Sequence, residues 1–111
     1  MTVLTLIGPK LSCDAAHDQP CGGDNCAHWE HLSVTLPAGS QYVATHYFTN
    51  ADTPNDLSDV RETGPGEVAW AHFSEAQVAP NANNEPVVSS IYFNRSSRVR
   101  LVQLTVDYQM Q

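Results

Sequence analysis

The side chains best suited to chemistry are gathered between residues 11 and 31. This stretch reads LSCDAAHDQPCGGDNCAHWEH and holds every cysteine of the chain, at positions 13, 21 and 26, with histidines at 17, 28 and 31. Zinc is commonly bound by cysteine and histidine side chains. The spacing does not repeat a close pair of ligands, as common zinc modules do. A zinc site is therefore the alternative interpretation, and a disulfide-held loop with solvated histidines is the favoured one.

The odd number of cysteines predicts one disulfide and one remaining thiol. Cys21 and Cys26 form the easiest ring to close, because Gly22 and Gly23 between them tolerate a tight backbone. Pairing of Cys13 with either of the other two remains open. A disulfide implies an oxidising compartment, so we expect a secreted or cell-surface protein. The first ten residues lack a basic segment, and we do not interpret them as a signal peptide.

Carboxylates are concentrated in two loops, which raises calcium binding as an interpretation. One loop contains Asp14, Asp18 and Asp24, and the other contains Asp52, Asp56 and Asp59. Calcium takes six to eight oxygen ligands, which such loops can supply. No EF-hand pattern is present, so solvated acidic loops are the favoured interpretation and no cofactor is expected.

Catalysis is not predicted, because the sequence contains no recognisable nucleophile or acid–base motif. His46 and His72 could face each other across strands and work with Glu67 or Asp59. Two half-buried, hydrogen-bonded histidines explain the same residues more simply. We therefore expect a protein that is not an enzyme.

The charge excludes several classes of partner. The chain has a formal net charge of −7 and only five basic residues. Nucleic-acid binders need lysine and arginine to attract phosphates, and anionic membrane surfaces repel an acidic protein in the same way. No apolar run approaches the roughly 20 residues of a membrane helix. Neutral ligands, cations and other proteins remain.

The hydrophobic pattern has a period of two and predicts strands throughout. In Glu30–Leu36, leucines and valine alternate with polar residues, which is typical of a half-buried antiparallel strand. The adjacent apolar residues Leu101 and Val102 predict a β-bulge or a change of sheet. The six predicted strands are Thr2–Ile7, Glu30–Leu36, Gln41–Thr49, Glu67–Phe73, Val87–Phe93 and Arg98–Tyr108.

Long polar loops separate these strands, at Leu11–Asn25, Asn50–Gly66 and Ser74–Pro86. Asn94-Arg95-Ser96 matches a glycosylation pattern but is interpreted as a turn. The chain length suits one domain. We predict that residues 1–111 form a single all-β domain, an antiparallel β-sandwich or jelly-roll-like fold of about six to eight strands.

The predicted function is non-catalytic ligand binding by loops at one end of the sandwich. Trp70 is expected in the core, which leaves Trp29 as the exposed stacking residue. Aromatic rings with amides and carboxylates suit ligands rich in hydroxyls, so we expect a lectin-like, carbohydrate-binding module whose partner is a glycan or another neutral polar molecule. The predicted ligand contacts are Trp29, Asp24, Asn25, Asp52, Asn55 and Asp56.

A structural or assembly domain is the second hypothesis for this chain. An odd cysteine and exposed strand edges are both compatible with association into a homo-oligomer. Appendage-, capsid- or toxin-associated modules are examples of this class. Because lectins are also often symmetric oligomers, mass alone does not separate the two hypotheses, whereas glycan binding does.

Overall fold

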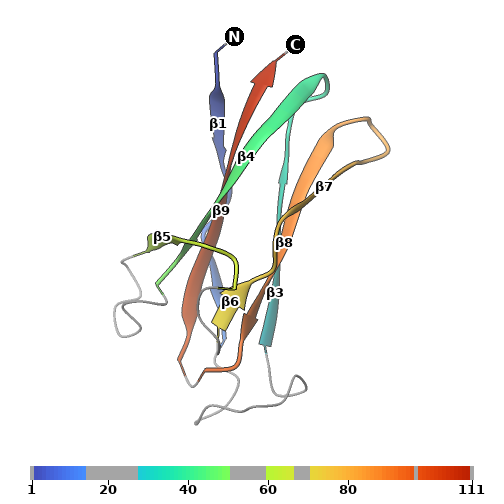
Figure 1. The fold of residues 1–111 in the computed structure, drawn as a ribbon. Helices are drawn as coiled ribbons and strands as arrows, with labels where there is room; N and C mark the ends of the chain where they lie inside the picture. Colours follow the sequence, from blue (N-terminus) through green and yellow to red (C-terminus); the bar gives the residue numbers. More distant parts are fainter. Residues whose placement is uncertain (1, 15–27, 51–59, 67–70, 97, 111) are drawn as a thin grey trace.

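A computed structural model describes residues 2–14, 28–50, 60–66, 71–96 and 98–110, and these residues form an all-β fold. Two antiparallel sheets pack against each other, as predicted, and the described residues contain nine strands and no helix (Figure 1). The described part of the chain has no helix able to span a membrane. The strands are β1 (Leu4–Ile7), β2 (Leu11–Cys13), β3 (His28–Thr35), β4 (Ser40–Thr49), β5 (Arg61–Thr63), β6 (Ala71–Phe73), β7 (Gln77–Pro80), β8 (Pro86–Asn94) and β9 (Arg100–Met110).

Each sheet is built around one long strand that has a divided edge strand at its side. In the first sheet, the order is β1-β9-β4-β5, and β2 pairs with the same strand β9 as β1 does. In the second sheet, the order is β3-β8-β6, and β7 also pairs with β8. β1 and β2 therefore line successive parts of β9, and β6 and β7 line successive parts of β8.

Gly8 allows the chain to bend between β1 and β2 without leaving the edge of β9. Its N–H donates to the carbonyl oxygen of Leu104 at 2.9 Å. A Cβ at this position would lie 2.8 Å from that same oxygen and 3.0 Å from Val34. Only glycine permits this close approach, so the type of residue 8 is set by the packing of two strands.

The core lies between the two sheets and is made of the inward side chains of their long strands. β3 follows the predicted alternation, with Leu32 and Val34 buried and His31, Ser33 and Thr35 exposed. Phe73 joins the sheets, because its ring lies 5.4 Å from Tyr47 of the first sheet and 4.7 Å from Tyr92 of the second. The buried apolar residues are Cys13, Leu32, Val34, Leu36, Tyr47, Ala71, Phe73, Val88, Tyr92, Val102, Leu104 and Val106.

The predicted β-bulge or change of sheet at Leu101 and Val102 is wrong. The bulge is in β4 between Tyr42 and Ala44, whereas β9 pairs without interruption at Leu101 and Val102. The bulge brings Tyr42 against the core, and its hydroxyl lies 2.7 Å from that of Thr45. Leu101 and Val102 face opposite sides of an unbroken strand, so two adjacent apolar residues do not require a bulge here.

Arg100, two residues before Val102, lies on the same inward face of β9 and is only 7% exposed. Its Nε donates to the Ser96 hydroxyl at 3.3 Å. Its positive charge also opposes the rise in the pKa of the buried Tyr92 hydroxyl, which burial causes. Arg100, one of the five basic residues, therefore contributes to the interior and hardly to the protein surface.

Three short strands were not predicted, because each lies in a stretch rich in polar or turn-forming residues. β2 lies in the expected Leu11–Asn25 loop, β5 in Asn50–Gly66, and β7 in Ser74–Pro86. β7 continues into β8 through a hairpin in which the Asn81 carboxamide oxygen accepts from the N–H groups of Asn83 and Glu85. Pairing with a long neighbouring strand, and not local periodicity, stabilises these segments.

Candidate functional site

Trp29 lies near the start of β3 on the outer face of the second sheet. Its side chain is 50% exposed, as predicted. β3 pairs with β8 so that Trp29 lies opposite Phe93. Because adjacent residues of a strand point to opposite faces, Tyr92 is buried in the core and Phe93 faces outward.

Phe93 is the centre of an aromatic row that crosses three neighbouring strands. The Trp29 ring meets it at a centroid distance of 4.7 Å and an angle of 64°. On the other side, His72 of β6 lies at 5.3 Å with an angle of 29°. Each such aromatic contact contributes about 0.5–1.5 kcal/mol beyond the area it buries. We call Trp29, Phe93 and His72 the aromatic row; it presents a fixed, half-exposed indole to solvent.

A cleft lined mainly by polar residues, called here the polar cleft, lies on the same sheet. It contacts β8 at Ser89, Ser90 and Ile91, a short distance before Phe93 of the aromatic row. Its volume is about 380 Å³, within the range of small-molecule sites. Residues of β8 form one side, and the segment from Ser74 to Gln77, which leads from β6 into β7, forms the other. The lining residues are Ser74, Glu75, Gln77, Ser89, Ser90 and Ile91.

The sequence-predicted ligand contacts are only partly placed. Trp29 is described and exposed, whereas the other five predicted contacts lie outside the described residues. Those five residues are Asp24, Asn25, Asp52, Asn55 and Asp56. The expected core position of Trp70 also lies outside the described residues. Sequence reasoning missed Phe93, although the apolar residues on both faces of the predicted strand Val87–Phe93 were an available signal. It considered His72 only for catalysis and did not place it near Trp29.

Cys13 is the only cysteine among the described residues, because Cys21 and Cys26 lie outside them. Cys13 is a free thiol and 1% exposed. Burial, reinforced by the negative charges of Glu30 and Asp14, raises the pKa of its thiol to about 12. Such a thiol stays protonated and unreactive. The Cys21–Cys26 disulfide stays a prediction, and in that arrangement Cys13 is the remaining thiol.

The metal hypotheses gain no support from the parts of the chain that are placed. Among these residues, no group of three or more histidine, cysteine, aspartate or glutamate side chains could hold a metal ion. Cys13 Sγ lies 3.7 Å from the backbone oxygen of His28. Three of the six proposed zinc ligands, His17, Cys21 and Cys26, lie outside the described residues, as does every proposed calcium ligand except Asp14.

A second polar arrangement crosses the outer face of the first sheet. His46 of β4 lies between two carboxylates: its Nδ1 is 2.5 Å from Glu62 of β5 and its Nε2 is 2.8 Å from Asp107 of β9. The hydroxyl of Thr5 in β1 donates to Asp107 at 2.9 Å. We call these four side chains, one from each of four adjacent strands, the charged row. Both ring nitrogens are occupied, so the charged row holds strands together and does not offer a free base.

The disfavoured alternative, in which His46 and His72 face each other across strands, is wrong, because the two residues lie on different sheets. His46 faces outward from β4 of the first sheet, and His72 stacks on Phe93 at the outer face of the second. Alternation along each strand puts both rings on the outside of the sandwich, with the core between them.

The charged row predicts a defined pH dependence of stability. Two hydrogen bonds raise the pKa of His46 above 6.5, the bond to Asp107 having the larger effect and the bond to Glu62 the smaller. The same bond with His46 lowers the pKa of Asp107 below 3.8. The stabilisation from His46 is complete below its unfolded pKa and is lost as pH rises through its folded pKa. The stabilisation from Asp107 is lost as pH falls through its own folded pKa. The joint contribution is therefore greatest between pH 3.8 and 6.5.

We expect the thermal unfolding midpoint to fall on the alkaline side of this window, as His46 loses its proton. His46→Gln should remove that part of the pH dependence, because glutamine does not titrate. Calorimetry of both proteins across the pH range measures the difference. Identical alkaline slopes in the two proteins would show that the His46 charge does not contribute.

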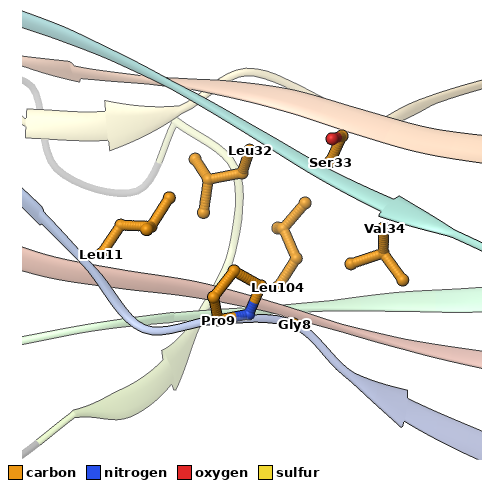
Figure 2. A pocket seen from close by; sticks show the side chains of 7 residues that line it. All are labelled: Gly8, Pro9, Leu11, Leu32, Ser33, Val34 and Leu104. Atoms are coloured by element: carbon orange, nitrogen blue, oxygen red, sulfur yellow. The ribbon is translucent and has the colours of Figure 1, made fainter.

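A small apolar cavity lies where Gly8 and Pro9 pass β3 (Figure 2). Its volume is about 10 Å³, roughly enough for one water molecule. Leucine and valine side chains line most of it, together with Ser33. The cavity is a packing defect beside the bend at Gly8 and is too small to bind a ligand.

No protein-family model, curated protein or solved structure matches this chain. Function is therefore inferred from the geometry of the two sheet faces. The aromatic row is the stronger candidate site, because it combines an exposed ring, fixed ring neighbours and an adjacent polar cleft. The charged row is fully engaged within the protein.

Proposed function

We propose that this protein is a non-catalytic binding module for a glycan, and that the ligand stacks on Trp29. The observation that carries the proposal is the half-exposed indole held against Phe93 on an outer sheet face. The exposed half of this large ring contributes nothing to the core, so it is free to contact a ligand. Stacking on the apolar face of a sugar ring is the use that fits its geometry.

The aromatic row supports binding because its rings are ordered before a ligand arrives. Phe93 contacts Trp29 on one side and His72 on the other, so the indole has a fixed neighbour. The entropy of ordering these rings is then lost on folding and not on binding. A pre-ordered ring needs fewer additional contacts to reach a useful affinity.

The charge of the protein narrows the ligand class. A net charge of −7 disfavours polyanions and leaves neutral or cationic molecules. Hydroxyl groups of a neutral glycan can donate to carboxylates and amides. Within this proposal, the loop residues Asp24, Asn25, Asp52, Asn55 and Asp56 remain candidate contacts. Secretion or display at the cell surface is the location that suits such a function.

The proposal is tested by a glycan array followed by titration of bound glycans against Trp29→Ala. We expect Trp29→Ala to weaken binding by about tenfold or more, which corresponds to about 1.4 kcal/mol. Trp29→Phe should keep part of the affinity, because a smaller ring still stacks. Val43→Ala is the matched control, since Val43 is also exposed but lies on the first sheet.

The assembly hypothesis has one structural observation in its favour. β3 is eight residues long and stands at the end of its sheet's strand order, where a second copy of the chain could add a strand. A lack of glycan binding at millimolar concentration, together with a defined oligomer that buries Trp29, would favour this second function over the first.

A further inference from the structure

The polar cleft lies in line with the aromatic row on the same face of the second sheet. Phe93, Ile91 and Ser89 alternate along β8 and share its outer face. A strand rises about 3.4 Å per residue, so Ile91 lies about 7 Å and Ser89 about 14 Å from Phe93. The cleft therefore begins beside the aromatic row and extends away from it along β8.

The cleft exists because the edge strand is interrupted between β6 and β7. At the interruption, the Ser74 N–H donates to the Ile91 carbonyl at 2.8 Å, and the Ile91 N–H donates to the Ser74 hydroxyl at 3.0 Å. The Ser90 hydroxyl donates to the Ser74 carbonyl at 2.7 Å. Two residues later, the Ala76 N–H donates to the Tyr47 hydroxyl at 2.8 Å. These bonds fix the bend, so the cleft is part of the folded structure.

The lining of the cleft suits a chain of hydroxyl-bearing rings. Glu75, Gln77 and Ser89 are exposed and provide a carboxylate, an amide and a hydroxyl, while Ile91 provides an apolar surface. Carboxylate and amide oxygens accept hydrogen bonds from ligand hydroxyls, and the amide N–H groups donate in return. The carboxylate of Glu75 also disfavours anionic ligands at this end.

We infer that the cleft is a second subsite and that the ligand is an extended oligosaccharide of neutral or amino sugars. This inference rests on the proposed glycan-binding function. One sugar ring would stack on Trp29, and the following rings would run along β8 into the cleft. A single ring on the indole does not reach Ser89, so both subsites are filled only by a longer chain.

The test is calorimetric titration with cello- and chito-oligosaccharides, from the monosaccharide to the hexasaccharide. We expect affinity to rise with chain length and then level off once the cleft is filled. Gln77→Ala and Ser89→Ala should weaken binding of the long chains severalfold and leave the monosaccharide unaffected. Gln41→Ala and Ser12→Ala are matched controls, because both residues are exposed but belong to the first sheet.

The failures of the two proposals are distinguishable. Binding that requires Trp29 but is independent of length, and of Gln77 and Ser89, would overturn the second subsite and leave the proposed function standing. If the protein binds none of the oligosaccharides, and Trp29→Ala gives the same glycan-array result as the unchanged protein, both the second subsite and the proposed function would be overturned. Circular dichroism of each variant establishes that the fold is retained.

Discussion

Phe73→Ala is expected to lower the free energy of unfolding by about 3–5 kcal/mol, the usual cost of truncating a fully buried phenylalanine. Phe73 is 1% exposed and contacts an aromatic ring from each sheet, Tyr47 and Tyr92. Removing its ring leaves a cavity at the point where the two sheets meet. Neighbouring strands restrict the collapse of that cavity, so the full penalty is expected.

Urea denaturation followed by tryptophan fluorescence and by circular dichroism measures this loss. Phe73→Leu should cost less, since it retains most of the buried volume. Ile7→Ala is the control, because Ile7 is apolar but 68% exposed, and surface changes of this kind usually stay within about 0.5 kcal/mol. A loss below about 1 kcal/mol for Phe73→Ala would contradict the described packing.

Asn94→Ala is the second large expected effect, with a loss of about 3–5 kcal/mol, because several buried hydrogen bonds depend on one side chain. Asn94 is fully buried, and its Nδ2 lies within 3.3 Å of the carbonyl oxygens of Cys13, Asp14 and Arg98. The Oδ1 atom accepts from the N–H and hydroxyl of Ser96. Alanine removes all of these hydrogen bonds at a position that is itself fully buried, so water cannot readily take the place of the amide.

The measurement is again urea denaturation, with Asn81→Ala as the control. Asn81 also accepts two backbone hydrogen bonds, but it is exposed, so water can replace its oxygen and the expected loss is only about 1 kcal/mol. Asn94→Asp should be nearly as damaging as Asn94→Ala, because a carboxylate has no N–H group to donate to the carbonyl oxygens around Nδ2. Equal losses at the two asparagines would argue against Asn94 as the centre of the turn.

The same contacts explain why Asn94-Arg95-Ser96 serves as a turn in this fold. The amide nitrogen that would carry a glycan belongs to a buried side chain and is engaged with backbone oxygens. The asparagine connects the end of β8 to the segment that follows β2 and to the start of β9. A local pattern of three residues therefore has a structural role that its sequence alone indicates only as a turn.

The site was predictable only in part. Trp29 could be identified as exposed because it lies beside a loop rich in glycine and aspartate. Phe93 and His72 are distant from it in the sequence, and only strand pairing brings the three rings together. Binding was predicted in the loops, whereas the exposed aromatic surface of the described residues lies on a sheet face.

The all-β class and most of the long strands could be predicted from local pattern, because a period of two is a property of neighbouring residues in the chain. The same pattern also predicted the phase of β3, where apolar and polar residues alternate from Leu32 to Thr35. The short strands β2, β5 and β7, the bulge in β4 and the burial of Arg100 could be seen only in the tertiary structure. Each feature is set by the strand that pairs with the segment or by the side chains that pack against it across the core. Both kinds of partner come from residues far apart in the sequence.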